Sequence, residues 1–237
     1  MVEALLRPRR RRAGGALTAA AARYAALGWP VCAGARPVAD KRRTGQDRGG
    51  QRRGDRQPLR RAGRACSCDR VGCPAPGAHP LSPAWQLEAT ADQAVVRAWW
   101  TLWPQASILL VTGRVFDVLD VPERAGAIAL ARLAAARKRA GPVAAGTGER
   151  ALFFVTSRSA AAEDDEWWSC HLDCEPESVP EVTGLRWHCR DSYVLAPPSR
   201  LMDGTAARWL VRPDTAALPD ALPLLEFLAD ACEEIGP

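Results

Sequence analysis

The chain has 237 residues, of which 47% are hydrophobic and 25% charged, and its formal net charge is +5. This size and composition are typical of a soluble globular protein with a sizeable core in one domain or in two closely packed lobes. No apolar span of about 18 residues occurs, which excludes a membrane-spanning helix. The charge is uneven, because residues 1–64 hold 17 Lys and Arg against 4 Asp and Glu, whereas residues 65–237 hold 15 against 23.

Residues 1–12 form a basic tail before an apolar stretch at residues 13–22. A signal peptide has this order of segments, but Arg23 interrupts the apolar stretch, and we therefore expect a cytoplasmic protein. Closely spaced cysteines in a reducing cytoplasm bind metals more often than they form disulfides. The eight cysteines of this chain therefore favour metal binding.

A helix is expected in "LTAAAARYAALGWPV", ended by Gly28 and followed by a short strand at residues 29–32. Residues 36–64 contain eleven basic residues and almost nothing apolar, so we expect a disordered insertion. Contact with nucleic-acid phosphates explains this composition, and so does a solvated low-complexity loop. The arginines selected by the first interpretation are Arg42, Arg43, Arg52, Arg53, Arg60 and Arg61.

The cysteine loop at residues 65–80 holds four candidate metal ligands, namely Cys66, Cys68, Cys73 and His79. Three thiolates and an imidazole complete a tetrahedral zinc site, and a Pro- and Gly-rich loop can wrap around the ion. The spacing C-x-C-x4-C-x5-H differs from the common paired C-x2-C arrangement. Reduced thiols without a metal are therefore the alternative.

Further candidate ligands lie between residues 170 and 189. They are Cys170, His171, Cys174, His188 and Cys189, which hold a second metal only if the intervening segment folds back. Cys32 and Cys232 stand apart and are expected to be buried apolar residues. Trp187, close to Arg190, is a candidate for stacking on a nucleic-acid base.

After the cysteine loop, "EATADQAVVRAWWTLWP" predicts an amphipathic helix. Thr90 and Gln93 have the spacing of a capping box, and the tryptophans at 99, 100 and 103 lie on the apolar face. Strands at 107–111 and 115–121 are expected to form a hairpin.

The remaining expected elements are a helix at 123–140, strands near 142–146 and 151–156, strands in "SYVLAPPS" and "ARWLV", and a C-terminal helix in 216–237. Strands and helices mix without an internal repeat. The fold class is therefore α+β with a mostly antiparallel sheet.

The predicted strand "VFDVLDV" carries two carboxylates in an otherwise apolar run. A buried strand contains acids where they face water or a cation. Asp117 and Asp120 are three residues apart, so their side chains point to opposite faces of the strand. The two acids therefore cannot readily bind the same metal ion.

The order of these segments resembles the N-terminal domain of bifunctional DNA primase-polymerases, of the archaeo-eukaryotic primase superfamily. The matching pieces are "AARYAALGWPV", "CPAPGAHP", "ATADQAVVRAWWTLWPQASILLVTG", "FDVLDV" and "SYVLAPPSRLMDG". The resemblance implies a primase-polymerase-like domain at residues 13–215, in which an RRM-like sheet packs with a second α/β lobe. It also implies template-directed nucleotidyl transfer in DNA replication, with DNA and nucleotides as partners and Mg²⁺ or Mn²⁺ as cofactor. No P-loop motif occurs, so any replicative helicase is expected in trans.

The catalytic pattern of that family is incomplete in this sequence. The resemblance implies two carboxylates two residues apart on one strand; Asp120 matches the first, but Pro122 stands at the second. Glu123 is a weaker candidate for the second carboxylate. The resemblance also implies a third acid later in the chain, where this sequence has Arg186 or Trp187, and the nearby Asp191 is a weak candidate for it. The family's phosphate-contacting histidine would stand at Ala151.

We therefore expect a DNA primase/polymerase relative, a nucleotidyltransferase by family, that is catalytically reduced or inactive. One alternative is a non-catalytic nucleic-acid-binding or regulatory protein. A second alternative is a zinc-stabilised scaffold unrelated to nucleic acid.

Overall fold

A computed structural model describes residues 3–38, 66–68, 70, 73–146, 148–157, 177–178, 184–200, 206–215 and 217–236. Its helices are α1 (Glu3–Ala26), α2 (Trp85–Glu88), α3 (Gln93–Leu102), α4 (Glu123–Ala135) and α5 (Ala221–Ile235). Its strands are β1 (Val31–Gly34), β2 (Ser107–Val111), β3 (Phe116–Pro122), β4 (Val143–Ala145), β5 (Arg150–Thr156), β6 (Glu177–Ser178), β7 (Arg186–His188), β8 (Tyr193–Leu195) and β9 (Arg208–Val211). Within these ranges, every helix is too short or too polar to cross a membrane.

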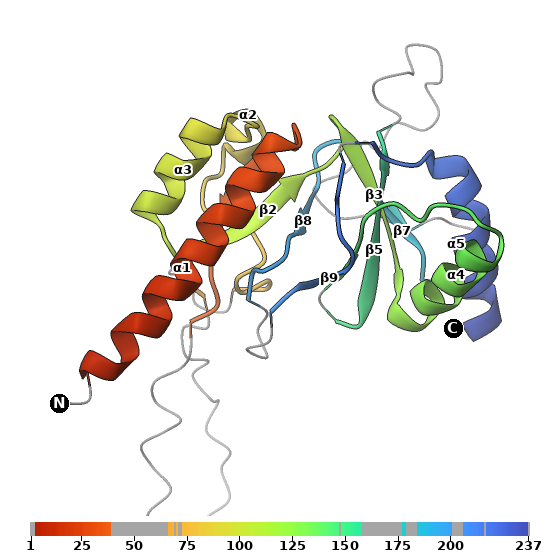
Figure 1. The fold of residues 1–237 in the computed structure, drawn as a ribbon, viewed down its shortest axis with the longest axis horizontal. Helices are drawn as coiled ribbons and strands as arrows, with labels where there is room; N and C mark the ends of the chain where they lie inside the picture. The colour runs from red at the N-terminus through yellow and green to blue at the C-terminus, as the bar shows by residue number, and fades with distance from the viewer. Residues whose placement is uncertain are drawn as a thin grey trace, which may run out of the picture.

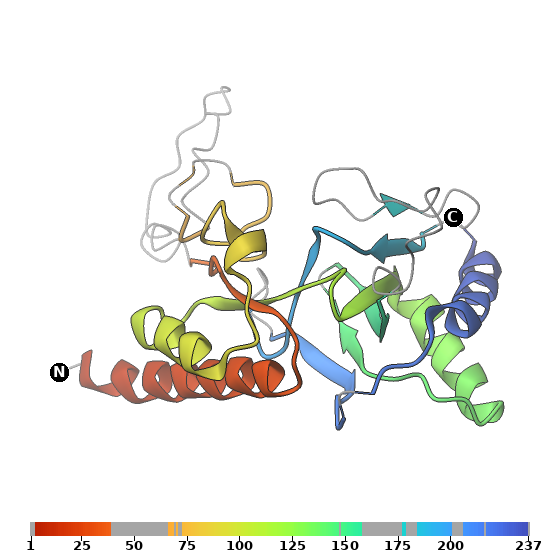
Figure 2. The same cartoon turned by 90° about the horizontal axis from the view of Figure 1, so that it is seen from above.

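The strands of the described residues form two antiparallel sheets. One is three-stranded, in the order β1-β2-β8, and the other is six-stranded, in the order β6-β7-β3-β5-β4-β9. Helices α1 and α3 lie together beside the smaller sheet, and α4 and α5 lie together at the far end of the larger sheet (Figures 1 and 2). The predicted α+β class with antiparallel sheets is confirmed, while the RRM-like description stays a prediction.

Two hydrophobic clusters hold these layers together. The first joins α1 and α3 to the smaller sheet and to one face of the larger sheet, where Phe116 and Phe154 lie. Its centre is Trp29, whose ring stacks on that of Phe154 with 5.3 Å between centroids and 5° between planes. The second cluster packs α4 and α5 on the opposite face of the larger sheet. Both faces of β3 are therefore covered by apolar side chains.

The prediction of a hairpin at residues 107–121 is wrong. Strand β2 pairs with β1 and β8, whereas β3 pairs with β5 and β7 in the other sheet. Residues 112–115 therefore carry the chain from one sheet to the other. The Thr112 N–H donates to the Ser192 carbonyl (3.0 Å), and the Gly113 N–H donates to the Phe116 carbonyl (2.8 Å).

Helix α3 has its N-cap two residues after Thr90, the N-cap of the expected capping box. Its N-cap is Asp92, whose carboxylate accepts from two N–H groups of the first turn at 2.7 and 3.3 Å. Thr90 instead accepts the Asp92 N–H at 3.0 Å. On the apolar face Trp100 is buried as expected, but Trp103 is 48% exposed.

Other helix and strand boundaries differ from those expected from the sequence, and local backbone turns explain the differences. Gly28 ends α1 with φ +79°, as expected, but the Trp29 N–H still bonds the last turn of that helix, so β1 starts at residue 31. Helix α4 ends at residue 135 instead of 140, because Arg137 takes φ +55° and closes the helix. Most of the expected basic tail, residues 1–12, belongs to α1.

Replacing Gly113 by alanine tests the crossing between the sheets. Gly113 has φ +82°, and a Cβ there would overlap the Arg190 backbone, so we expect the free energy of unfolding to fall by at least about 3 kcal/mol. Gly28→Ala is the matched control, because Gly28 has a similar φ but no atom within 4 Å of a Cβ, and it should cost about 1 kcal/mol. Urea unfolding measures both, and equal losses would contradict the close approach at Gly113.

Candidate active site and metal centre

Asp120 lies near the end of β3, between two neighbouring strands. In the strand register it is opposite Leu152 on β5 and Arg186 on β7. Side chains alternate along a strand, so Asp120 shares its face with Val118 in the first cluster, and Asp117 lies on the α4/α5 face. The two aspartates thus point to opposite faces, as expected. Only 5% of Asp120 is exposed.

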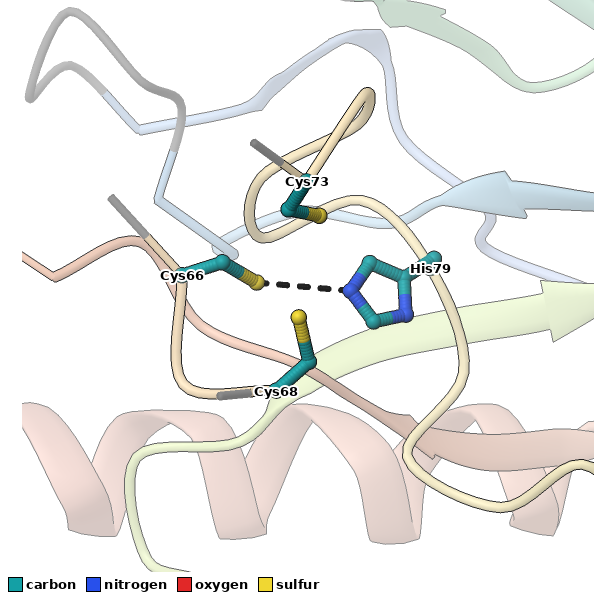
Figure 3. A group of neighbouring side chains, drawn as sticks. All are labelled: Cys66, Cys68, Cys73 and His79. Carbon is teal, nitrogen blue, oxygen red and sulfur yellow. Dashed lines mark hydrogen bonds between the residues drawn. The ribbon is translucent and has the colours of Figure 1, made fainter. Parts of the chain in front are cut away.

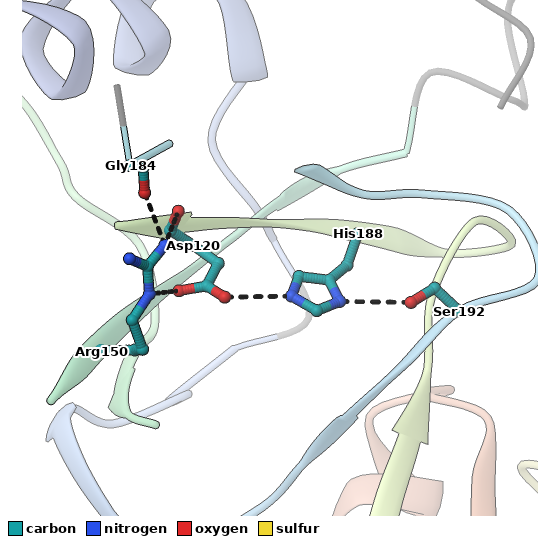
Figure 4. Close-up of polar contacts among 5 residues, drawn as sticks. All are labelled: Asp120, Arg150, Gly184, His188 and Ser192. Atoms are coloured by element: carbon teal, nitrogen blue, oxygen red, sulfur yellow. Dashed lines mark hydrogen bonds and ion pairs between the residues drawn. The ribbon is translucent and has the colours of Figure 1, made fainter. Parts of the chain in front are cut away.

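Arg150, the first residue of β5, donates three hydrogen bonds, two to Asp120 and one to Gly184 (Figure 4). Its Nε donates to Asp120 Oδ1 at 2.6 Å. Its Nη2 donates to the Asp120 carbonyl at 2.9 Å and to the Gly184 carbonyl at 2.6 Å. Because its side chain is only 16% exposed, this guanidinium forms a largely buried ion pair.

The second carboxylate oxygen of Asp120 faces His188 on β7. His188 Nε2 is 3.2 Å from Asp120 Oδ2, and its Nδ1 is 3.2 Å from Ser192 Oγ (Figure 4). These residue types occur in hydrolase triads, but Ser192 is only 4% exposed and its carbonyl is held by Thr112. The arrangement is a buried polar chain between the sheets without an accessible nucleophile.

The other acids proposed from the sequence lie elsewhere. Glu123 begins α4, and its Oε1 is 3.3 Å from Nη2 of Arg208 on β9. Asp191 is exposed in the turn after β7, where it has φ +60°. The structure therefore brings neither carboxylate into contact with Asp120.

The position matched to the family's histidine lies on β5, the strand beside β3. Ala151 is fully buried on the α4/α5 face, opposite Val121 and directly against Gly126. It therefore points away from Asp120. The residue of β5 that reaches Asp120 is its neighbour, Arg150.

The residues proposed for nucleic-acid contact have mixed environments. Trp187 packs against the second cluster and its Nε1 donates to Asp117 Oδ2 at 3.2 Å, on the face opposite Asp120. Arg190 is exposed in the turn beside Gly113. The six arginines of the basic insertion, from Arg42 to Arg61, lie outside the described residues.

A second site is formed by Cys66, Cys68, Cys73 and His79, as the sequence predicted. Their candidate ligand atoms all lie within 4.8 Å of one another, and the side chains converge on one point (Figure 3). His79 Nε2 is 3.3 Å from Cys66 Sγ, while His79 Nδ1 is 2.8 Å from the Pro80 carbonyl. Such an outer contact fixes the ring and leaves Nε2 to bind an ion. These four residues can hold a metal.

The cysteine loop is attached to the free edge of β1. The Ala35 N–H donates to the His79 carbonyl at 2.8 Å, and the Leu81 N–H donates to the Ala33 carbonyl at 3.0 Å. At its other end, Ser67 exchanges two 3.0 Å hydrogen bonds with Arg36. The candidate ligands are therefore held by the smaller sheet, and the loop covers a strand edge that would otherwise be open.

Two members of the second proposed ligand group, His188 and Cys189, lie within the described residues, and neither belongs to a metal-ligand cluster there. His188 contacts Asp120 and Ser192, and Cys189 is disulfide-bonded. Cys170, His171 and Cys174 lie outside the described residues. Cys32 and Cys232 are buried free thiols, as expected.

Comparison with known families identifies the domain. The family described as "Bifunctional DNA primase/polymerase, N-terminal" (Prim-Pol) matches residues 21–223 of this chain. The chain belongs to the Prim-Pol family. A search of curated proteins found no match. The expected resemblance is thus confirmed, and it covers β3, β5, β7 and the cysteine loop alike.

The divalent metal site that this Prim-Pol domain would use for nucleotidyl transfer does not fit the described residues around Asp120. Mg²⁺ and Mn²⁺ need several oxygen ligands, usually with more than one carboxylate. Both carboxylate oxygens of Asp120 already have cationic or N–H partners, and Pro122, two residues on, faces Arg150 instead of adding an oxygen.

Arg150, His188 and Ser192 were not proposed as partners of Asp120 from the sequence. A signal existed for Arg150, because alternation along "RALFFVT" places it on the same face as Leu152 and Phe154. Recognising it required the β3–β5 register, in which Arg150 stands opposite Pro122. His188 and Ser192 are four residues apart and lie at a junction between sheets, which no local pattern marks.

The surroundings of the thiols in the cysteine loop predict an order of reactivity. The Arg70 backbone N–H lowers the pKa of the Cys68 thiol to about 7, whereas burial raises the pKa of Cys73 to about 11. Since the thiolate is the reactive form, Cys68 should be alkylated by iodoacetamide before Cys73 in metal-free protein at neutral pH. A bound metal should protect both thiols. Mass spectrometry with and without a chelator measures this, and earlier modification of Cys73 would contradict it.

Proposed function

We propose that this Prim-Pol domain has reduced or absent template-directed nucleotidyl transfer. The observation that carries the proposal is that both carboxylate oxygens of Asp120 already have partners. Arg150 Nε lies 2.6 Å from Oδ1, and His188 Nε2 lies 3.2 Å from Oδ2. In a two-carboxylate site these oxygens would bind the metal that clamps a nucleotide triphosphate. Here they neutralise a guanidinium instead.

The family supports a primase/polymerase-like ancestry for the domain, with DNA and nucleotides as the ligands of its relatives. A role in DNA replication, a helicase in trans and a cytoplasmic location stay predictions. Glu123 and Asp191 also stay candidates for an acid that joins Asp120 in another state of the protein, although their side chains lie apart from it.

A primer-extension and de novo priming assay with Mn²⁺ and labelled nucleotides tests the proposal. We expect the parent protein to give background synthesis, and Asp120→Asn to be indistinguishable from it, because Asp120 binds no catalytic metal. The variant Pro122→Asp/Arg150→His restores a second carboxylate and places an imidazole on the Asp120 face, so it should gain Mn²⁺ affinity. Robust synthesis by the parent that is lost in Asp120→Asn would overturn the proposal.

Nucleic-acid binding without catalysis is the second candidate function. It is favoured by cations near the Asp120 face: Arg186 is exposed and has no ion-pair partner within the described residues, and Arg190 is exposed in the following turn. We propose that these side chains and the arginines of residues 36–64 contact phosphates, with Trp187 as a weaker candidate for base stacking.

The salt dependence of DNA binding tests this second function. Changing Arg42, Arg43, Arg52, Arg53, Arg60 and Arg61 to Gln should weaken binding to single-stranded DNA. It should also reduce the slope of log K against log salt by up to about 4, because each neutralised phosphate releases about 0.7 counterions. The sixfold Arg→Lys variant keeps the charge and should keep the slope. Fluorescence anisotropy measures both, and an unchanged slope in the Gln variant would leave the insertion as a solvated loop.

We also propose that the metal held by the cysteine loop is zinc. Three thiolates and an imidazole form a closed, soft ligand set that suits zinc and leaves no open position for catalysis. A structural role follows, because the same loop pairs with β1. Elemental analysis of the purified protein, compared with Cys66→Ser, tests the identity of the ion.

A further inference from the structure

The buried carboxylate of Asp120 needs a partner that balances its charge, and no other residue of β3 supplies one. A carboxylate that is 5% exposed loses most of its hydration and needs a cation or several hydrogen bonds. In a metal-dependent nucleotidyltransferase the divalent ion would supply that charge. In this chain the neighbouring positions on the same face are Val118 and Pro122, whose side chains supply neither a charge nor a hydrogen bond.

Arg150 meets this requirement from the adjacent strand. Its guanidinium binds one carboxylate oxygen and two backbone carbonyls, those of Asp120 and Gly184. A hard divalent cation seeks the same kinds of oxygen, namely carboxylate and carbonyl. The guanidinium therefore occupies the charge position and the ligand oxygens together.

We propose that Arg150 is a built-in cation that takes the place of a divalent metal beside Asp120. The inference rests on the proposed function and deepens it, because it names the residue that occupies the cation position beside Asp120. Arg150 balances the Asp120 charge, connects β3, β5 and residue 184, and excludes Mg²⁺ or Mn²⁺. A second cation at these oxygens would meet both a full hydrogen-bond set and a like charge.

The geometry singles out Arg150 from the other arginine on this face. Arg186 is directly opposite Asp120 in the β3–β7 register, yet it is exposed and forms no ion pair among the residues that the structure describes. A position opposite Asp120 in the strand register is therefore not enough to form an ion pair with it. Arg186 provides a matched control, since its removal changes the same local charge without exposing the Asp120 oxygens.

The experiment compares Arg150→Met with Arg186→Met by thermal unfolding and by Mn²⁺ binding, followed by electron paramagnetic resonance of the free ion. Arg150→Met should lower Tm by about 10 °C, because it leaves a buried carboxylate without its cation. Mn²⁺ should then bind the variant and recover several degrees of Tm. The parent protein and Arg186→Met should show neither effect.

The double variant Arg150→Met/Asp120→Asn keeps the test decisive if the single variant is too unstable. It removes the buried charge and should unfold at a higher temperature than Arg150→Met, with no response to Mn²⁺. The inference is overturned if the parent already binds Mn²⁺ through Asp120. It is also overturned if Arg150→Met is no less stable than Arg186→Met, or if the double variant is no more stable than Arg150→Met.

These outcomes are separate from those of the proposed function. DNA synthesis by a parent protein that takes up no Mn²⁺ at Asp120 would refute the reduced activity and leave the role of Arg150 intact. Asp120-dependent Mn²⁺ uptake without synthesis would refute the role of Arg150 and leave the reduced activity intact.

Discussion

The packing of Trp29 is the interaction on which the arrangement of the two sheets depends. Its buried ring contacts Tyr24 of α1, Phe116 of β3 and Phe154 of β5, with centroids 6.1, 5.0 and 5.3 Å apart. Aromatic pairs in these geometries add to the free energy of burying their large apolar area. Trp209 of β9 completes the cluster and donates its indole N–H to the Tyr24 hydroxyl at 2.8 Å. The first helix and the central strands of the larger sheet are thereby fixed relative to one another.

This packing also fixes which residue meets Asp120. With Phe116 and Phe154 both in the aromatic cluster, the β3–β5 register is set, because a one-residue slip of either strand would move its ring to the α4/α5 face. In the set register Arg150 stands opposite Pro122, next to Asp120, and Ala151 turns to the other face. The ion pair at the polar end of the strand is thus a consequence of aromatic packing at its other end. A proline at residue 122 and a guanidinium beside Asp120 are therefore compatible with an undisturbed core.

The sequence predicted what alternation and local chemistry determine, and failed where distant segments choose their partners. The opposite faces of Asp117 and Asp120, the helix end at Gly28 and the convergence of Cys66 to His79 all follow from short spacings. The turn at Gly113 has the same local signature in a hairpin and in a crossing between sheets. The pairing of β2 decides between them, because β1 and β8, the latter about 80 residues later in the sequence, take the positions on both sides of β2. The partners of Asp120 were missed for the same reason, since each depends on pairing across 30 to 68 residues.

The two candidate cation sites of this domain differ in kind, and the difference follows from their ligand atoms. Around Asp120 the available ligands are oxygens, which suit hard ions that exchange water and substrates readily. Such a site is easily replaced by a guanidinium, which offers N–H donors to the same oxygens. The cysteine loop offers thiolates and an imidazole, which no protein cation can satisfy in a tetrahedral set. Because the loop also covers the edge of β1, a metal bound there would stabilise the smaller sheet directly, whereas the Asp120 carboxylate is balanced by the side chain of Arg150.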